Sequence, residues 1–231
     1  MMSQAFAPQP DDATGATADH DETELATQIV AKLCHDFISP AGAMTSALDL
    51  MTDPNSADMH ADALDLMQQS AARMVALVRF ARVAYGAATS NQNFSSDELR
   101  TTVTDLLGGG RASIDWRIPD GDYAKPHARI LVNLAYVALG ALPTGGTATL
   151  DARRMDGDLI LTTVSEGPRA RLKPEAVQGL SGAQLTDGLP GQWIQPHWLW
   201  RSVRGQGGTL QVSTDESRVE LIVRLPLSSH G

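Results

Sequence analysis

LCHDFISPAGAMTSALDLM, residues 33–51, is the stretch that decides the fold. Its large apolar side chains return at steps of three, four and seven residues, and they are Leu33, Phe37, Met44, Leu48 and Met51. This spacing places them on one face of an α-helix. Asp21 and Glu22 add negative charge at the start of that helix, where the helix dipole favours it. We therefore predict a helix from about residue 22 to residue 52.

A second long helix follows the turn signal Asp53-Pro54-Asn55. Its apolar side chains alternate strictly at steps of three and four until the chain reaches Gly86, and they are Leu64, Met67, Ala71, Met74, Val78, Ala81 and Tyr85. Two long helices joined by a short turn form an antiparallel hairpin. A lone hairpin leaves part of its apolar surface uncovered, so we expect two copies to pair into a four-helix bundle. The sequence thus predicts a homodimer.

The remainder of the chain predicts a second, α+β domain. Helices are expected over residues 96–107, with Ser95 or Ser96 as the N-cap, and over 126–142 and 195–204. Strands are expected over residues 114–118, 147–153, 159–164, 209–213 and 219–225. The expected organisation is a disordered tail at 1–20, the hairpin at 21–90, and the second domain at 91–231, which begins with a linker at 91–96.

Composition restricts the class of protein. The chain has 231 residues, of which 42% are hydrophobic and 19% charged, which is typical of a globular protein. Cys34 is the only cysteine, which excludes a disulfide framework and a cysteine-based zinc site. The net charge of −9 disfavours nucleic-acid binding, since phosphate contacts need clustered Lys and Arg. No signal peptide or membrane-spanning stretch is recognised, so we expect a cytoplasmic protein without a membrane partner.

His35 is the candidate functional residue of the first helix. With about 100° per residue, the apolar stripe that begins at Leu33 spans roughly 60°, and His35 lies at about 200°, on the opposite side. Ser39, Gly42 and Ser46 share its side and Ala43 flanks them, so a partner helix would meet a smooth surface there. The alternative is that an alanine-rich sequence scatters small residues without purpose. We take Gly42, Ala43 and Ser46 as candidate partner-binding residues.

The residues around His35 suit phosphoryl transfer. Imidazole is a nucleophile at neutral pH. Asp36 would orient the ring nitrogen that does not react, and Ser39 would hold a water or an acyl-phosphate oxygen. The alternatives are an ordinary solvated helix charge at Asp36 and ordinary surface polarity at Ser39. Pro40 removes an amide donor and predicts a kink beside this site.

Residues 35–40, HDFISP, resemble the H-box of sensor histidine kinases, and residues 33–43 resemble the ChpT-type histidine phosphotransferases of alphaproteobacteria. Residues 95–227 are similar in order and spacing to the ATP-binding domain of those kinases, with 131–138 similar to its N-box. The resemblance implies that His35 relays a phosphoryl group between response-regulator receiver domains, including that of a hybrid histidine kinase, in cell-cycle signalling. It also implies that Mg²⁺ would be supplied by the receiver.

The ATP chemistry of such a domain is missing from this sequence. Val137 stands where the N-box has a second asparagine, and a valine cannot bind Mg²⁺. Residues 165–171 lack the adenine-reading Asp-x-Gly-x-Gly. Trp193 and Trp198 replace the glycines whose amides would surround the phosphates. We predict a phosphotransferase with no bound cofactor, no nucleotide binding and no kinase activity of its own.

Three questions stay open at this stage. The second domain either braces the bundle or helps to hold the regulator, in which case Arg169 and Arg171 would attract the acidic receiver. The first alternative function is a sensor histidine kinase with an atypical ATP site. The second is a dimeric scaffold that docks regulators without transferring phosphate.

Overall fold

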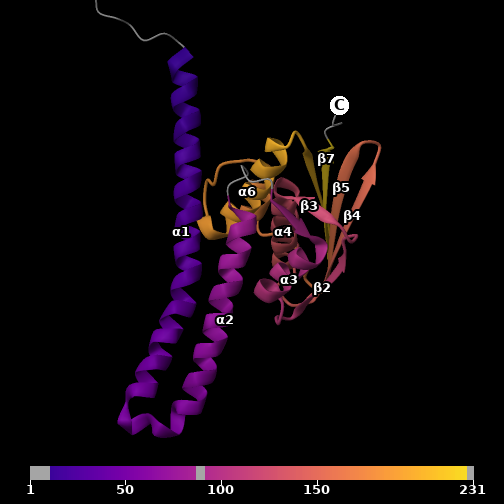
Figure 1. The fold of residues 1–231 in the computed structure, drawn as a ribbon. Coiled ribbons are helices and arrows are strands. Elements are labelled where there is room, and N and C mark those ends of the chain that lie inside the picture. Colours follow the sequence, from indigo (N-terminus) through magenta and orange to yellow (C-terminus); the bar gives the residue numbers. More distant parts are fainter. Residues whose placement is uncertain (1–10, 87–91, 228–231) are drawn as a thin grey trace, which may run out of the picture.

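A long helical hairpin and a helix-covered β-sheet make up the structure, a computed structural model that describes residues 11–86 and 92–227 (Figure 1). The hairpin consists of α1 (Asp11–Thr52) and α2 (His60–Ala84), joined by the 3-10 helix η1 (Pro54–Met59). Asp53 caps η1 by accepting a hydrogen bond of 2.9 Å from the amide of Asn55. The predicted antiparallel hairpin is confirmed.

Helix α1 begins at Asp11, earlier than the expected start near residue 22, so it includes the second half of the segment expected to be a disordered tail. Alanine, which stands at positions 13, 16 and 18, is the strongest helix former and favours the longer helix. The first half of that segment, residues 1–10, lies outside the described residues. Pro40 is buried within α1, which continues past it to Thr52 and bends in its C-terminal part (Figure 1).

The face of α1 that is buried within one chain is rotated from the predicted stripe. Leu25, Pro40 and Ala47 are buried, whereas Leu48, a member of the stripe, is 53% exposed. On the helical wheel Leu48 lies about 100° from Ala47. The contacts of α1 with α2 and α6 therefore cover one edge of the predicted stripe and leave its other edge open.

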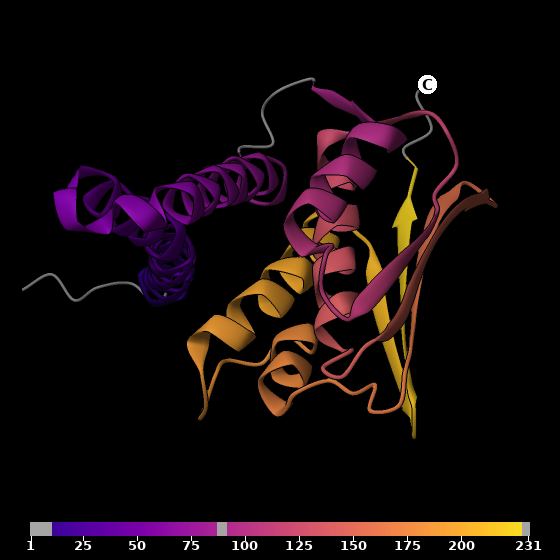
Figure 2. The same ribbon diagram turned by 90° about the horizontal axis from the view of Figure 1, so that it is seen from below.

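A five-stranded sheet in the order β2-β4-β5-β7-β6 forms the second domain, with β2 and β4 parallel and the other neighbours antiparallel. A small sheet, β1-β3, stands apart. The strands are β1 (Asn93–Ser95), β2 (Ala112–Arg117), β3 (Asp122–Ala124), β4 (Gly146–Met155), β5 (Asp158–Glu166), β6 (Thr209–Asp215) and β7 (Arg218–Pro226). The helices are α3 (Ser96–Leu107), α4 (Lys125–Gly140), α5 (Pro174–Leu180) and α6 (Pro190–Gly205). Figure 2 shows these helices between the sheet and the hairpin.

Several elements of the second domain differ from the sequence prediction. Residues 93–95, expected within a linker, form β1, which pairs with β3 through Phe94 and Tyr123. Helix α6 begins at Pro190 rather than near residue 195, and α5 was not predicted. The capping of α3 follows the expectation, because Ser95 accepts from the amide of Glu98 at 3.2 Å and the Glu98 carboxylate accepts from the amide of Ser95 at 2.8 Å.

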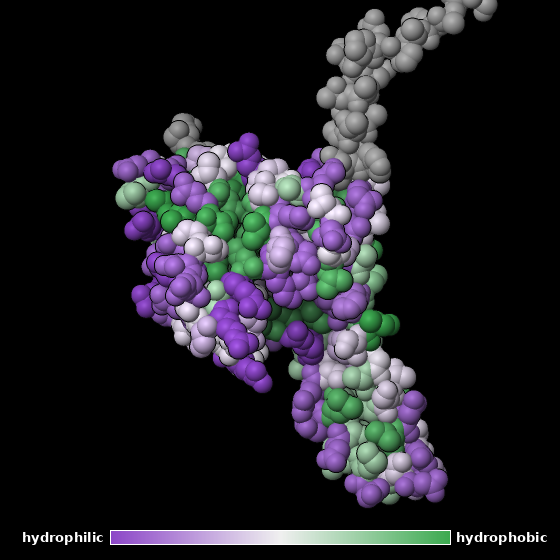
Figure 3. All heavy atoms as spheres, turned by 180° about the vertical axis from the view of Figure 1, so that it is seen from behind, coloured by the Kyte–Doolittle hydropathy of each residue, from purple (hydrophilic) through white to green (hydrophobic). Residues whose placement is uncertain are grey.

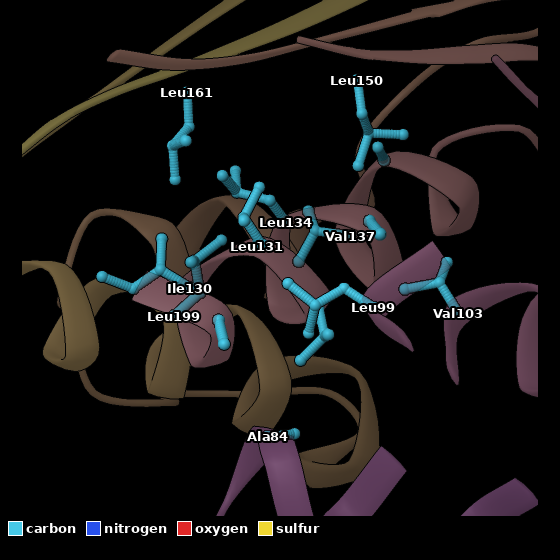
Figure 4. Close-up of a cluster of buried hydrophobic side chains, with 14 of the residues drawn as sticks. Ala84, Leu99, Val103, Ile130, Leu131, Leu134, Val137, Leu150, Leu161 and Leu199 are labelled. Atoms are coloured by element: carbon cyan, nitrogen blue, oxygen red, sulfur yellow. The ribbon is translucent and has the colours of Figure 1, made fainter. Parts of the chain in front are cut away.

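Helix α4 is the centre of the core. Its residues Leu131 and Leu134 lie opposite Leu150 and Leu161 of the sheet (Figure 4), and these four side chains are at most 1% exposed. Its other side packs against α2, α3 and α6. Contacts on both sides explain why α4 is apolar around most of its circumference. None of the helices in the described residues has the length and apolar character needed to cross a membrane.

Polar contacts attach the end of α2 to the second domain. The indole of Trp198 donates to the Ala84 carbonyl at 2.6 Å, and the amide of Gln195 donates to Asn133 at 2.6 Å. The Tyr85 hydroxyl donates to the side-chain oxygen of Gln195. Burial, followed by the effects of Tyr136 and Asp36, raises the pKa of Tyr85, so its hydroxyl stays protonated as a donor. These contacts fix the hairpin against α4 and α6.

Candidate functional site

His35 lies on the exposed side of α1, where 86% of its side chain is accessible. It borders a cleft of about 500 Å³ between the hairpin and the second domain. The cleft is lined by residues of α1, α2, α3, α4 and α6, among them Lys32, Asp36, Ser39, Ala43, Leu66, Gln69, Arg73, Phe80, Leu106, Tyr136 and Gln195. An accessible imidazole beside a cleft of this size is open to a reaction partner.

Asp36 links the imidazole to the interior of the cleft. Its Oδ1 lies 3.4 Å from Nδ1 of His35, and its Oδ2 accepts a hydrogen bond of 2.7 Å from Nζ of Lys32. A carboxylate beside Nδ1 favours the tautomer with the proton on that nitrogen, which leaves the lone pair on Nε2. A nucleophilic ring with a carboxylate on its far nitrogen has the arrangement needed for covalent group transfer.

Lys32 is the member of this group that sequence reasoning missed. Only 9% of its side chain is exposed, and its Nζ lies 3.4 Å from the Tyr136 hydroxyl and 5.3 Å from the centre of the Tyr136 ring. Burial lowers the pKa of the Lys32 ammonium, but Tyr136 and Asp36 stabilise its charged form and raise that pKa above the ordinary value. The spacing of four residues between Lys32 and Asp36 was a usable signal for the ion pair.

The other residues that the sequence predicts for the site on α1 lie either in the cleft or on the exposed surface of the helix. Ser39 and Ala43 line the cleft together with His35 and Asp36. Gly42 and Ser46 are exposed on α1, and a Cβ added at Gly42 would meet no atom within 4 Å. Within one chain, therefore, nothing requires a glycine at position 42.

Arg169 and Arg171 lie apart from His35. Both are exposed in the segment between β5 and α5. Neither belongs to the described residues that line the cleft beside His35. The structure thus does not bring the two arginines into the immediate surroundings of the imidazole.

Apolar side chains are also exposed near His35. Ile38, three residues further along α1, is 69% exposed, and Leu66 of α2, which lines the cleft, is 39% exposed. Large apolar side chains that are exposed together beside a reactive group are typical of surfaces that bind other proteins.

The residues that resemble parts of a kinase nucleotide site make structural contacts in this protein. Asn133 is fully buried, donates to the Arg129 carbonyl at 2.7 Å and accepts from Gln195. Val137 borders a cavity of only about 160 Å³. Trp193 and Trp198 belong to α6, and their indoles donate to the backbone carbonyls of Ala183 and Ala84.

Among the side chains that the structure describes, no three from His, Cys, Asp or Glu come together in a group that could hold a metal ion.

Comparison with known proteins places the chain in a family. Residues 96–218 match the model of the histidine phosphotransferase C-terminal domain. The chain is 26% identical over 176 residues to the protein phosphotransferase ChpT of Brucella abortus (strain 2308), which covers 76% of this chain and 83% of that protein.

A solved structure has the same fold. One described as a bacterial phosphotransferase matches with a TM-score of 0.75 and 22% identity, over 87% of this chain and 96% of that one. The histidine kinase domain of a blue-light-activated kinase from Erythrobacter litoralis matches with a TM-score of 0.47 and 16% identity, over 83% of this chain and 94% of that one. Since the family model covers more than half of the chain, the protein belongs to the histidine phosphotransferases and is a phosphotransferase.

Proposed function

We propose that the protein relays a phosphoryl group between response-regulator receiver domains through His35, in the cytoplasm. The observation that carries this proposal is the exposed imidazole of His35, with Asp36 at its Nδ1, on the border of a cleft beside a helical hairpin. The family supplies the reaction class, and among the side chains that the structure describes His35 is the exposed histidine with a carboxylate at its ring nitrogen.

The transfer step uses Nε2 of His35. Its lone pair attacks the phosphorus of the receiver's aspartyl phosphate, the bond between phosphorus and the aspartate oxygen breaks, and the aspartate leaves with the electron pair as a carboxylate. Positive charge develops on the ring and is shared with the Nδ1–H group, where Asp36 stabilises it. The reverse step, with a second receiver's aspartate as the nucleophile, returns the imidazole. Mg²⁺ in the receiver's acidic pocket would stabilise the phosphoryl oxygens.

A receiver would dock over His35 by apolar and small-residue contacts. Ile38 and Leu66 offer exposed apolar surface beside the imidazole. The side chains of α1 near His35 are small, and they belong to Ser39, Gly42, Ala43 and Ser46. A helix of the receiver could therefore approach the backbone of α1 closely. Ser39, which lines the cleft, would also hold a water or a phosphoryl oxygen. Arg169 and Arg171 are exposed further away and would act at longer range by attracting an acidic receiver.

The experiment that tests the relay uses two receivers. A receiver domain from a hybrid kinase is phosphorylated with radiolabel, freed of nucleotide and mixed with the protein. Label is expected to pass to the protein within the dead time of manual mixing and to leave it when a second, unlabelled receiver is added. If no receiver donates label, the scaffold interpretation replaces the relay.

The active species is proposed to be a homodimer with a four-helix bundle. Besides Ile38 and Leu66, further apolar side chains on both helices of the hairpin stay exposed in the single chain, among them Val30 and Leu48 of α1 and Leu64, Val75 and Val78 of α2. Figure 3 shows hydrophobic residues at the surface of the half of the hairpin that extends beyond the second domain. A second hairpin placed against this surface would bury them.

We further propose that the second domain binds no nucleotide and that the chain has no autokinase activity. Sites for drug-sized ligands usually have volumes of about 300–1,000 Å³, whereas the cavity beside Val137 has about 160 Å³. Asn133 is the asparagine of the N-box-like segment that this sequence keeps. Its side-chain amide is already hydrogen-bonded to the Arg129 carbonyl and to Gln195.

The expected result of a titration with a fluorescent ATP analogue and Mg²⁺ is no saturable rise in anisotropy up to millimolar protein. A sensor kinase that binds ATP serves as the positive control in the same buffer. Saturable binding that unlabelled ATP displaces would instead favour the kinase with an atypical site.

A further inference from the structure

We propose that Lys32 is a positioning residue for phosphotransfer and that Tyr136, on α4 of the second domain, holds Lys32 in place. The inference rests on the proposed role of His35. It assigns a function in the reaction to a contact between the two domains that neither the family match nor the kinase-like fold explains.

An unbroken series of contacts leads from the imidazole to the second domain. Nδ1 of His35 lies 3.4 Å from Asp36, Asp36 accepts from Lys32 at 2.7 Å, and Nζ of Lys32 lies 3.4 Å from the Tyr136 hydroxyl. The Tyr136 ring is itself held by Phe80 of α2, with ring centroids 5.9 Å apart. Groups from α1, α2 and α4 therefore determine where the Asp36 carboxylate points.

Burial separates this ion pair from the ordinary pairs on helix surfaces. The Lys32 side chain is 9% exposed, whereas the partners of the surface pair Arg100–Asp97 are 55% and 75% exposed. A surface pair competes with water and holds its side chains loosely. A buried ammonium has few alternative partners, so it keeps its carboxylate in one orientation.

The two carboxylate oxygens of Asp36 have different partners. Oδ2 is engaged by Lys32, and Oδ1 is the oxygen that faces Nδ1 of His35. If Lys32 is removed, the carboxylate can rotate towards water, and Oδ1 no longer selects the ring tautomer with the proton on Nδ1. A smaller fraction of the protein then presents Nε2 as the nucleophile, so transfer slows without a change in receiver affinity.

Single-turnover transfer from a phosphorylated receiver tests this role. In Lys32→Met, the rate at saturating receiver is expected to fall at least about tenfold, since small losses of alignment have large effects on rate, while the half-saturating receiver concentration stays the same. Lys32→Arg should recover most of the rate. Tyr136→Phe, which keeps the ring and removes the hydroxyl, should give a smaller loss. Arg201→Met is the matched control, because it removes another ion pair of α1 with the second domain, Arg201–Glu22 at 3.3 Å, and should transfer at the wild-type rate.

The imidazole nitrogens give a readout that a purely structural role would not change. ¹⁵N NMR of His35 should show the Nδ1–H tautomer in the wild type and an increased share of the Nε2–H tautomer in Lys32→Met. Transfer at the wild-type rate in Lys32→Met, or an equal loss in Arg201→Met, overturns the inference. If the protein still accepts label without His35, the proposed function itself fails, which is a separate result.

Discussion

The His35→Gln variant is expected to accept no phosphoryl group from any phosphorylated receiver. Glutamine keeps a polar side chain of similar reach, but the lone pair of its amide nitrogen is delocalised and does not attack phosphorus. Because 86% of the His35 side chain is exposed, the free energy of unfolding should change by less than about 0.5 kcal/mol. Loss of labelling with an unchanged thermal unfolding curve would therefore report lost chemistry and not lost structure.

His60→Gln is the matched control for this result. His60 is also an exposed histidine of the hairpin, at the start of α2. The His60→Gln variant should accept label as the wild type does. Labelling of His35→Gln at the wild-type level would show that another residue carries the phosphoryl group.

The Val78→Glu variant is expected to convert the dimer into monomers. Val78 is 51% exposed in the single chain and belongs to the apolar stripe of α2. In the proposed bundle its side chain would be buried against the partner, where an unpaired carboxylate costs several kcal/mol on each side. Sedimentation velocity or light scattering of purified protein would report the change in mass.

Val177→Glu on α5 is the control for charge alone. Val177 is 49% exposed but lies in the second domain, outside the hairpin. This variant should stay dimeric. A wild-type protein that is monomeric at micromolar concentration, or a Val78→Glu protein that stays dimeric, would contradict the bundle formed through this face.

Much of the fold follows from patterns that are local in the sequence. The hairpin was predictable because its apolar residues repeat over many turns and Asp53-Pro54 marks the turn between the helices. The strands β4 and β5 were predictable because Asp156-Gly157 separates two alternating stretches, and the structure has both residues at positive φ. Helix α4 was predictable because its apolar run is too long for a strand.

Other elements left little trace in the sequence. The strands β1 and β3 have three residues each, too few to show a period of two. Helix α5 has seven residues, with Gly179 in its last turn and Gly182 just after its end, so its pattern resembles a loop. The first residues of α6, from Pro190, stand where the resemblance to kinases places a glycine-rich loop, so the sequence analysis predicts no helix there. Proline in the first turn nevertheless favours a helix.

In the candidate site, too, local contacts could be predicted from the sequence and long-range contacts could not. His35, Asp36 and Ser39 were found because they lie within one turn of one helix, so a helical wheel places them. The contact of Lys32 with Tyr136 joins residues 104 positions apart in the chain. Only the packing of the second domain against the hairpin creates that contact, and a single sequence holds no pattern that reports it.

The most direct test of the relay is to identify the atom that carries the phosphoryl group. The protein is incubated with a phosphorylated receiver, and ³¹P NMR with tandem mass spectrometry locates the modification before and after a second receiver is added. The expected result is one phosphoryl group on Nε2 of His35, which disappears as the aspartate of the second receiver becomes phosphorylated. Phosphate on any other residue, or a phosphohistidine that no receiver can discharge, would contradict the account.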